Sequence, residues 1–178
     1  MKRVMWLIPA ILGFVFCVTT AQAQEVPAWE VAGGYSYLRV NLKSPSYALN
    51  GGFGSLTENV NSWFGGRIEV GAFTGTESHT NVSAQTITYG PVFSTHRYQK
   101  ITPFAELQLG VIHGSAGYLG ISRDAFRFAM SPAVGVDLRI NDRAAVRLQG
   151  GYLLTHFLGL RQDNLEGSIG LVLRFGRK

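Results

Sequence analysis

The last segment of the chain alternates between apolar and polar positions with a period of two. In residues 165–176, LEGSIGLVLRFG, the odd-numbered positions are apolar or glycine, and the even-numbered positions include Glu166, Ser168 and Arg174. Such alternation is typical of a β-strand whose two faces meet different surroundings. In a soluble protein the apolar face is buried, whereas in a membrane-spanning barrel it faces lipid and the charged residues point inward.

The N-terminus has the features of a secretory signal peptide. Lys2 and Arg3 precede an apolar run over residues 4–18, the pattern of signals that direct export through the Sec pathway. The alternative is a membrane anchor, but the run is shorter than the roughly 20 residues that a spanning helix needs. The motif AQA, which ends at Ala23, predicts cleavage before Gln24.

Removal of a signal peptide of residues 1–23 leaves residues 24–178, enough for one domain. Cys17 is the single cysteine and lies in the signal peptide, so we expect neither disulfides nor a thiolate metal site. Without Lys2 and Arg3, 14 of the 16 basic residues remain against 11 acidic ones, a net charge of +3. Because this charge is mild and no basic cluster with interleaved aromatic residues occurs, we expect no nucleic-acid partner.

Alternating segments recur along the mature chain, where no apolar run approaches the length of a spanning helix. We predict eight strands, at residues 29–40, 47–57, 63–73, 85–96, 101–115, 125–140, 144–157 and 165–176. Several are long enough for the roughly 9–11 residues with which a tilted strand crosses a bilayer. An even number of strands returns both chain ends to the same side of the membrane, as in bacterial outer-membrane barrels.

The connections between these segments predict the orientation of the barrel. Short turns alternate with longer polar breaks, which include residues 74–84 and 116–124. This pattern fits periplasmic turns at one end and longer outer loops at the other. Pro132 falls inside a predicted strand, where it removes a ladder hydrogen bond, so we expect a local bulge there.

The charged residues of the predicted strands gather on the face opposite the apolar one. In the third strand Ile68 and Val70 share one face, and Arg67 and Glu69 share the other. An Arg or Lys turned to lipid costs roughly 2–4 kcal/mol near the midplane, so in a barrel these charges belong inside. We predict an interior network of ion pairs that holds the lumen closed, formed by Arg67, Glu69, Glu106, Asp137, Arg139, Arg147, Glu166 and Arg174.

Arg39 is an exception, because it falls on the apolar face of its strand. It lies at the strand end, where a long side chain can snorkel to the membrane surface. Aromatic residues predict two interfacial belts, with Trp29 and Phe175 at the inner one and Tyr37 and Phe73 at the outer one. The alternative architecture is a soluble β-sandwich or lipocalin-like barrel with the faces exchanged.

Residues 29–176 resemble the small outer-membrane β-barrel family of OmpA-like and OmpX-like transmembrane barrels. The resemblance rests on segments such as GGYSYLRV at 33–40, ITPFAELQLG at 101–110 and LVLRFG at 171–176. It implies an all-β, eight-stranded antiparallel up-and-down transmembrane barrel in the outer membrane of a Gram-negative-type bacterium. The partners that it implies are outer-membrane lipid, lipopolysaccharide and, during insertion, the barrel-assembly machinery.

Members of this family end on an aromatic residue that the insertion machinery reads. The resemblance therefore implies an assembly signal at Leu171, Leu173 and Phe175, although three residues follow Phe175 here. No peptidoglycan-binding domain follows the barrel in this sequence, so a tethering role has no support.

For the function we expect a monomeric, non-enzymatic barrel with a structural or surface-interaction role in the cell envelope. Eight strands enclose just enough space for side chains, and a narrow low-conductance channel is one alternative. The scattered histidines lack metal-ligand spacing, so we expect no metal and no cofactor. The other alternative is a lipid A-modifying enzyme, because His113 and Ser115 on one strand face resemble lipid A deacylase. In that reading Asp124, beyond the next break, only loosely replaces the orienting acid.

Overall fold

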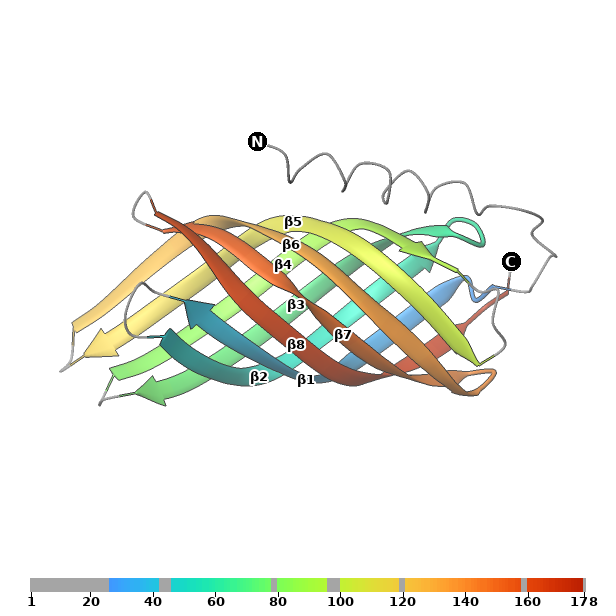
Figure 1. Ribbon diagram of the computed structural model, residues 1–178, viewed down its shortest axis with the longest axis horizontal. Coiled ribbons are helices and arrows are strands. Elements are labelled where there is room, and N and C mark those ends of the chain that lie inside the picture. Colours follow the sequence, from blue (N-terminus) through green and yellow to red (C-terminus); the bar gives the residue numbers. More distant parts are fainter. Residues whose placement is uncertain are drawn as a thin grey trace, which may run out of the picture.

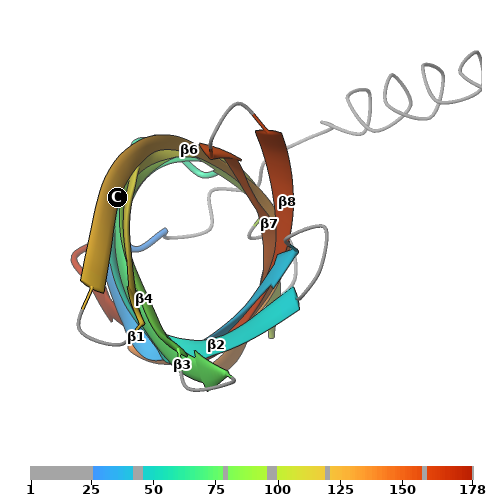
Figure 2. The ribbon, with the colours of Figure 1, turned by 90° about the vertical axis from the view of Figure 1, so that its left-hand side faces the viewer.

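The computed structural model describes residues 26–41, 46–77, 80–95, 100–118, 121–157 and 160–177. Within them every strand pairs antiparallel with the next and the first pairs with the last, which closes a barrel (Figure 1). Figure 2, turned by 90°, shows the strands as a closed ring. The strands are β1 (Trp29–Asn41), β2 (Ser46–Asn59), β3 (Phe64–Glu77), β4 (Thr80–Ser94), β5 (Ile101–Tyr118), β6 (Ile121–Asn141), β7 (Ala144–Phe157) and β8 (Leu160–Phe175). The predicted all-β, eight-stranded up-and-down barrel is confirmed.

The predicted signal peptide, with its cleavage between Ala23 and Gln24, lies outside the described residues. Within the described ranges, no helix is long and apolar enough to span a membrane.

The apolar face of the strands lies on the outside of the barrel. On β8, Ile169, Leu171 and Leu173 are each about half exposed, whereas Val172 and Arg174 on the alternate register are buried. A continuous apolar surface around a barrel is unfavourable in water, and buried arginines need partners of opposite charge. The arrangement therefore requires lipid around the wall, which excludes the soluble barrel with exchanged faces.

The strands extend farther than predicted at the end of the barrel opposite the chain termini. The prediction of loops at 74–84 and 116–124 is wrong, because β3 and β4 pair as far as Glu77↔Thr80, and β5 and β6 as far as Tyr118↔Ile121. Two residues separate the strands in each of these hairpins. The strand signal is absent from the sequence there, because outside the hydrocarbon region neither face has to be apolar and the alternation is lost.

The predicted bulge at Pro132 is also wrong. The pairing of β6 with β7 keeps one register on both sides of Pro132, and the register shifts only between Arg139 and Asn141, beside the turn. The pairing is interrupted at Ser131 and Pro132 and resumes in the same alignment. Proline has no N–H to donate, so a ladder bond is missing without an extra residue being inserted.

Candidate functional site: the filled lumen

The lumen near the chain termini contains a cluster of four charged side chains centred on Arg147. Its Nε donates to Asp137 Oδ1 at 2.7 Å, and its Nη2 donates to Asp137 Oδ2 at 2.8 Å and to Glu30 Oε2 at 3.0 Å. Arg174 lies 3.4 Å from Glu30 Oε1 and 3.5 Å from Asp137 Oδ2. Asp137 and Arg147 are cross-strand partners on β6 and β7, and Glu30 and Arg174 are partners on β1 and β8. The cluster thus joins the β6–β7 pair to the neighbouring β8–β1 pair inside the lumen.

A second cluster is centred on Arg67 of β3. The guanidinium donates through Nη1 to Glu106 on β5 and through Nε to Thr57 Oγ1 on β2, the latter at 2.8 Å. Gln149 of β7 donates from Nε2 to the other oxygen of Glu106 at 3.0 Å. These contacts connect four strands, so the cluster crosses the lumen instead of following one part of the wall.

The ring of Phe104 on β5 joins the two clusters. The Cζ atoms of Arg67 and Arg147 each lie 4.8 Å from the centre of this ring. Guanidinium groups at this distance are attracted by the negative face of an aromatic ring. The ring thus places one apolar group against both cations.

The two clusters balance their charge. Their three arginines and three carboxylates are all buried, and each has an oppositely charged group within 4.0 Å. Balance is required because an unpaired buried charge costs several kcal/mol, of order 3–5 when one partner of a pair is removed. The members are Arg67, Arg147, Arg174, Glu30, Glu106 and Asp137.

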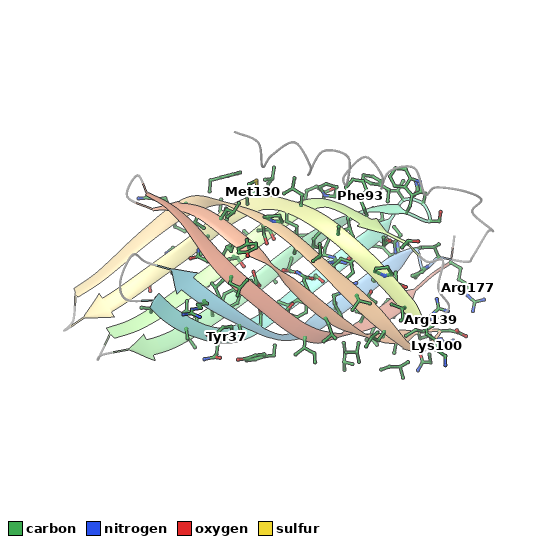
Figure 3. The ribbon with its side chains drawn as sticks, viewed as in Figure 1. Tyr37, Phe93, Lys100, Met130, Arg139 and Arg177 are labelled. Atoms are coloured by element: carbon green, nitrogen blue, oxygen red, sulfur yellow. The ribbon has the colours of Figure 1, made fainter. Side chains whose placement is uncertain are left out.

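The structure brings together five of the eight residues that the sequence placed in an interior network, Arg67, Glu106, Asp137, Arg147 and Arg174. Glu69 and Glu166 also face the lumen but lie outside the two clusters; Glu166 accepts a hydrogen bond from Ser36 Oγ at 2.9 Å. Arg139 shares the inner register of β6 at the end near the termini, and in the described ranges its Nε has no hydrogen-bond partner. Figure 3 shows Arg139 at this end together with Lys100 and Arg177.

Two members of the site were missed by the sequence prediction. Glu30 stands next to Trp29 at the start of its strand, and the phase of the outward residues Val31 and Tyr35 would have placed it inside. Phe104 carried no such signal, because an apolar side chain on a polar face gives no indication of two arginines from other strands.

The half of the lumen nearer the hairpin ends contains an apolar layer, which we did not predict from the sequence. Buried side chains from seven strands form it, and Val40 and Val82 pack against them. Phe73 belongs to it and is 4% exposed, so its predicted place in the outer aromatic belt is wrong. The apolar layer consists of Leu38, Leu49, Phe73, Ala84, Ile112, Ala129 and Leu153.

The two charged clusters and Phe104 together form a polar layer of the lumen. A small cavity lies within this layer, between the two clusters. Its volume is about 10 Å³, and Glu30, Arg67, Phe104 and Arg147 are among the residues that line it. A cavity of this size holds about one water molecule. The side chains of the two clusters thus leave room for about one water molecule between them.

His113 and Ser115 point outward from β5, on the register of the exposed Val111. The His113 ring stacks on Phe126 at a centroid distance of 4.4 Å, and Ser115 Oγ lies 3.0 Å from Ser83 Oγ. Asp124 is the cross-strand partner of Ser115, closer in the fold than the sequence indicated. Within the described ranges, no hydrogen bond joins His113 to Ser115, and no group of three His, Cys, Asp or Glu residues is placed to hold a metal.

The residues of the expected assembly signal lie on the outer register at the end of β8. Leu171, Leu173 and Phe175 are 58%, 49% and 52% exposed. Phe175 is the cross-strand partner of Trp29, so the first and last strands meet beside an outward pair of aromatic rings.

The fold is shared with several small outer-membrane barrels of known structure. Neisserial surface protein A matches with a TM-score of 0.74 at 11% identity, over 83% of this chain and 97% of that one. Ail, the attachment invasion locus protein of Yersinia pestis, matches with a TM-score of 0.64 at 14% identity, over 84% and 100% of the two chains. OprG of Pseudomonas aeruginosa gives 0.60 at 9% identity, over 88% and 99%. At these identities the likeness establishes the fold alone.

A search of curated proteins found no match to this sequence. The family model described as "Outer membrane protein beta-barrel domain" matches residues 8–175, nearly the whole chain. The chain therefore belongs to this family of outer-membrane β-barrel proteins of Gram-negative bacteria.

Proposed function

We propose that the protein is a non-enzymatic, closed barrel that serves the outer membrane as a structural and surface-exposed element. The observation that carries this proposal is the succession of two filled layers along the lumen. The polar layer offers ions a balanced set of buried charges with room for about one water molecule, and the apolar layer behind it opposes hydration. Two such layers in series close the barrel to solutes.

The proposed orientation places the chain termini in the periplasm and the hairpin ends outside. Export through the Sec pathway, with cleavage between Ala23 and Gln24, precedes assembly, in which the barrel-assembly machinery reads Leu171, Leu173 and Phe175. The protein then resides as a monomer among lipid and lipopolysaccharide. The surface that it presents consists of paired strand ends, since β3 with β4 and β5 with β6 remain paired up to their two-residue connections.

Conductance in a planar bilayer tests the closed lumen. We expect no resolved steps for the wild type, for a polar-layer variant (Arg67→Ala with Glu106→Ala) or for an apolar-layer variant (Leu38→Ala with Phe73→Ala). Each double variant opens one layer and leaves the other in place. The four substitutions together remove both barriers and are expected to produce small steps. Steps from the wild type would establish the narrow-channel alternative instead.

The enzymatic alternative is tested by mass spectrometry of lipid A. The expected result is that lipid A is the same with and without expression of the protein, because the Ser115 hydroxyl is engaged with Ser83 and the His113 ring with Phe126. A change in acylation that appears with the wild type and disappears with His113→Ala would contradict the proposal and identify an enzyme.

A further inference from the structure

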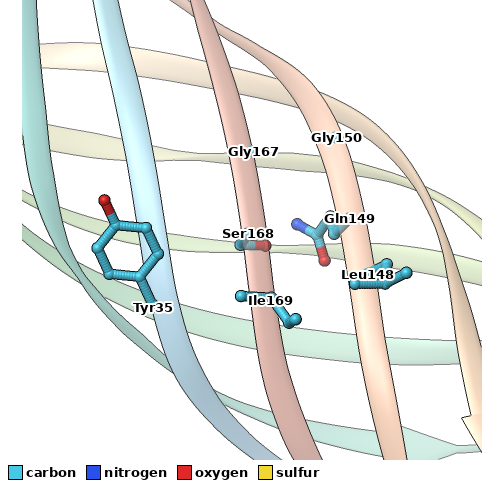
Figure 4. Close-up of a pocket in the computed structure, with 7 residues that line it drawn as sticks. All are labelled: Tyr35, Leu148, Gln149, Gly150, Gly167, Ser168 and Ile169. Atoms are coloured by element: carbon cyan, nitrogen blue, oxygen red, sulfur yellow. The ribbon is translucent and has the colours of Figure 1, made fainter.

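A shallow outward-facing groove crosses β7, β8 and β1 near the middle of these strands. It has a volume of about 470 Å³ and is lined mainly by apolar surface from residues of these three strands (Figure 4). Leu148, Ile169 and Tyr35 are successive cross-strand partners and form one wall. Gly150 and Gly167 are cross-strand partners of each other and form the floor. They are the next outward residues after Leu148 and Ile169 in the direction of the hairpin ends.

The glycines of the floor are not required by the packing of the barrel. A Cβ atom at Gly167 would meet nothing within 4 Å, and one at Gly150 would meet only the Glu166 carbonyl at 4.0 Å. By contrast, a Cβ at the lumen-facing Gly90 would lie 2.0 Å from the Leu107 carbonyl oxygen. Glycine weakens a strand and leaves a gap in its face. The two floor glycines therefore carry this cost without a steric reason, and their effect is to keep the groove open.

The only outward cation in the described part of β1 lies above this groove. Arg39 is exposed, and its cross-strand partner Leu165 is the next outward residue after Gly167 on β8. Among the described residues no ion pair to Arg39 occurs. Ten residues separate Trp29 from Arg39 along β1, which at about 3.3 Å per residue and a tilt near 40° corresponds to roughly 25 Å of height. Arg39 thus lies at the membrane interface opposite Trp29, level with lipid headgroups.

We infer that the groove and Arg39 together form a binding site for one phosphorylated, multiply acylated lipid of the lipid A type. Arg39 pairs with a phosphate at headgroup level, and an acyl chain descends over Gly167 and Gly150 between Leu148, Ile169 and Tyr35. Charge complementarity selects an anionic headgroup, since a guanidinium binds phosphate with charge-assisted hydrogen bonds. The choice of lipid A over a phospholipid rests on the proposed orientation, because Arg39 then lies at the surface of the outer leaflet.

Native mass spectrometry of the refolded barrel tests this site with diphosphoryl lipid A as the probe. We expect one lipid to be retained per barrel. Filling the floor with Gly150→Leu and Gly167→Leu should reduce retention by about tenfold, and Arg39→Gln by roughly fivefold. The matched control is Gly54→Leu, another outward position where a Cβ has room, with its nearest atom 3.8 Å away, and it should retain lipid as the wild type does. Arg39→Lys, which keeps the charge, should retain more lipid than Arg39→Gln.

Three outcomes would overturn the site. If the floor-filled barrel retains as much diphosphoryl lipid A as the wild type, the groove holds no acyl chain. If the wild type retains phosphatidylglycerol or dephosphorylated lipid A as well as it retains diphosphoryl lipid A, the site does not select this headgroup. A dimer in the wild type that disappears when the floor is filled shows that a second copy occupies the groove. Gel migration with and without boiling, measured on the same samples, reports insertion and folding independently, so a failure of the proposed function is distinguished from a failure of the site.

Discussion

Arg67 and Arg147, from β3 and β7, lie against the same Phe104 ring, each with its Cζ atom 4.8 Å from the ring centre. Two like charges are held near each other because each has its own carboxylate partner and both contact the same aromatic ring. The ring therefore couples two ion-pair clusters that would otherwise be separate parts of the lumen.

Replacement of Phe104 by leucine is expected to destabilise the barrel by about 2 kcal/mol, since two cation–π contacts are lost while most of the apolar volume remains. Urea unfolding in phospholipid vesicles, followed by the fluorescence of Trp29 and Trp63, measures the change. Phe128→Leu, at an exposed aromatic residue of the outer wall, is the control and should cost less. Equal losses at both positions would show that Phe104 acts only through its size.

Replacement of Arg147 by methionine is expected to cost about 3–5 kcal/mol, because Asp137 and Glu30 then remain buried without their principal cation. Arg147→Lys should restore only part of this, since a single ammonium cannot reproduce the three hydrogen bonds to two carboxylates. The measurement is the free energy of unfolding in the same vesicles. Addition of Asp137→Asn to Arg147→Met leaves Arg174 paired with Glu30 and should recover stability; the absence of recovery would contradict the role of unpaired charge.

An arginine on the outer wall should be costly in proportion to its depth. Ile87 lies on the outward register at the middle of β4, whereas Ile101 is the exposed first residue of β5. Ile87→Arg is expected to cost about 2–4 kcal/mol and Ile101→Arg at most about 1 kcal/mol. Unfolding in vesicles measures both variants. The opposite order would place the membrane at a different height on the barrel.

Alanine at Gly90 is expected to prevent folding into the closed barrel, because its Cβ would lie 2.0 Å from the backbone oxygen of Leu107. The fraction that refolds, read from gel migration with and without boiling, should fall severely. Gly167→Ala is the matched control, as nothing lies within 4 Å of its Cβ position, and it should refold like the wild type. A normal yield for Gly90→Ala would show that β4 and β5 can separate locally.

Several parts of the site could be predicted from the sequence, because they depend only on whether a residue stands at an odd or an even position of its strand (its parity). Whether Arg67 or Glu106 faces lipid or lumen follows from the position of each in an alternating strand, and so does the inward direction of Arg174. Glu166 shows the limit of this reasoning. It has the correct parity, yet its hydrogen-bond partner in the lumen is Ser36 and it joins no arginine cluster.

The class of fold and the side of the wall on which most strand residues lie follow from the sequence alone, since period-two alternation is a property of neighbouring residues. Tertiary structure decided which charges meet. Closure of β1 onto β8 and the register of each strand pair set the height of every side chain in the lumen, and heights are not encoded in parity. For the same reason the apolar layer around Phe73 became visible only in the closed barrel, as did the groove beneath Arg39.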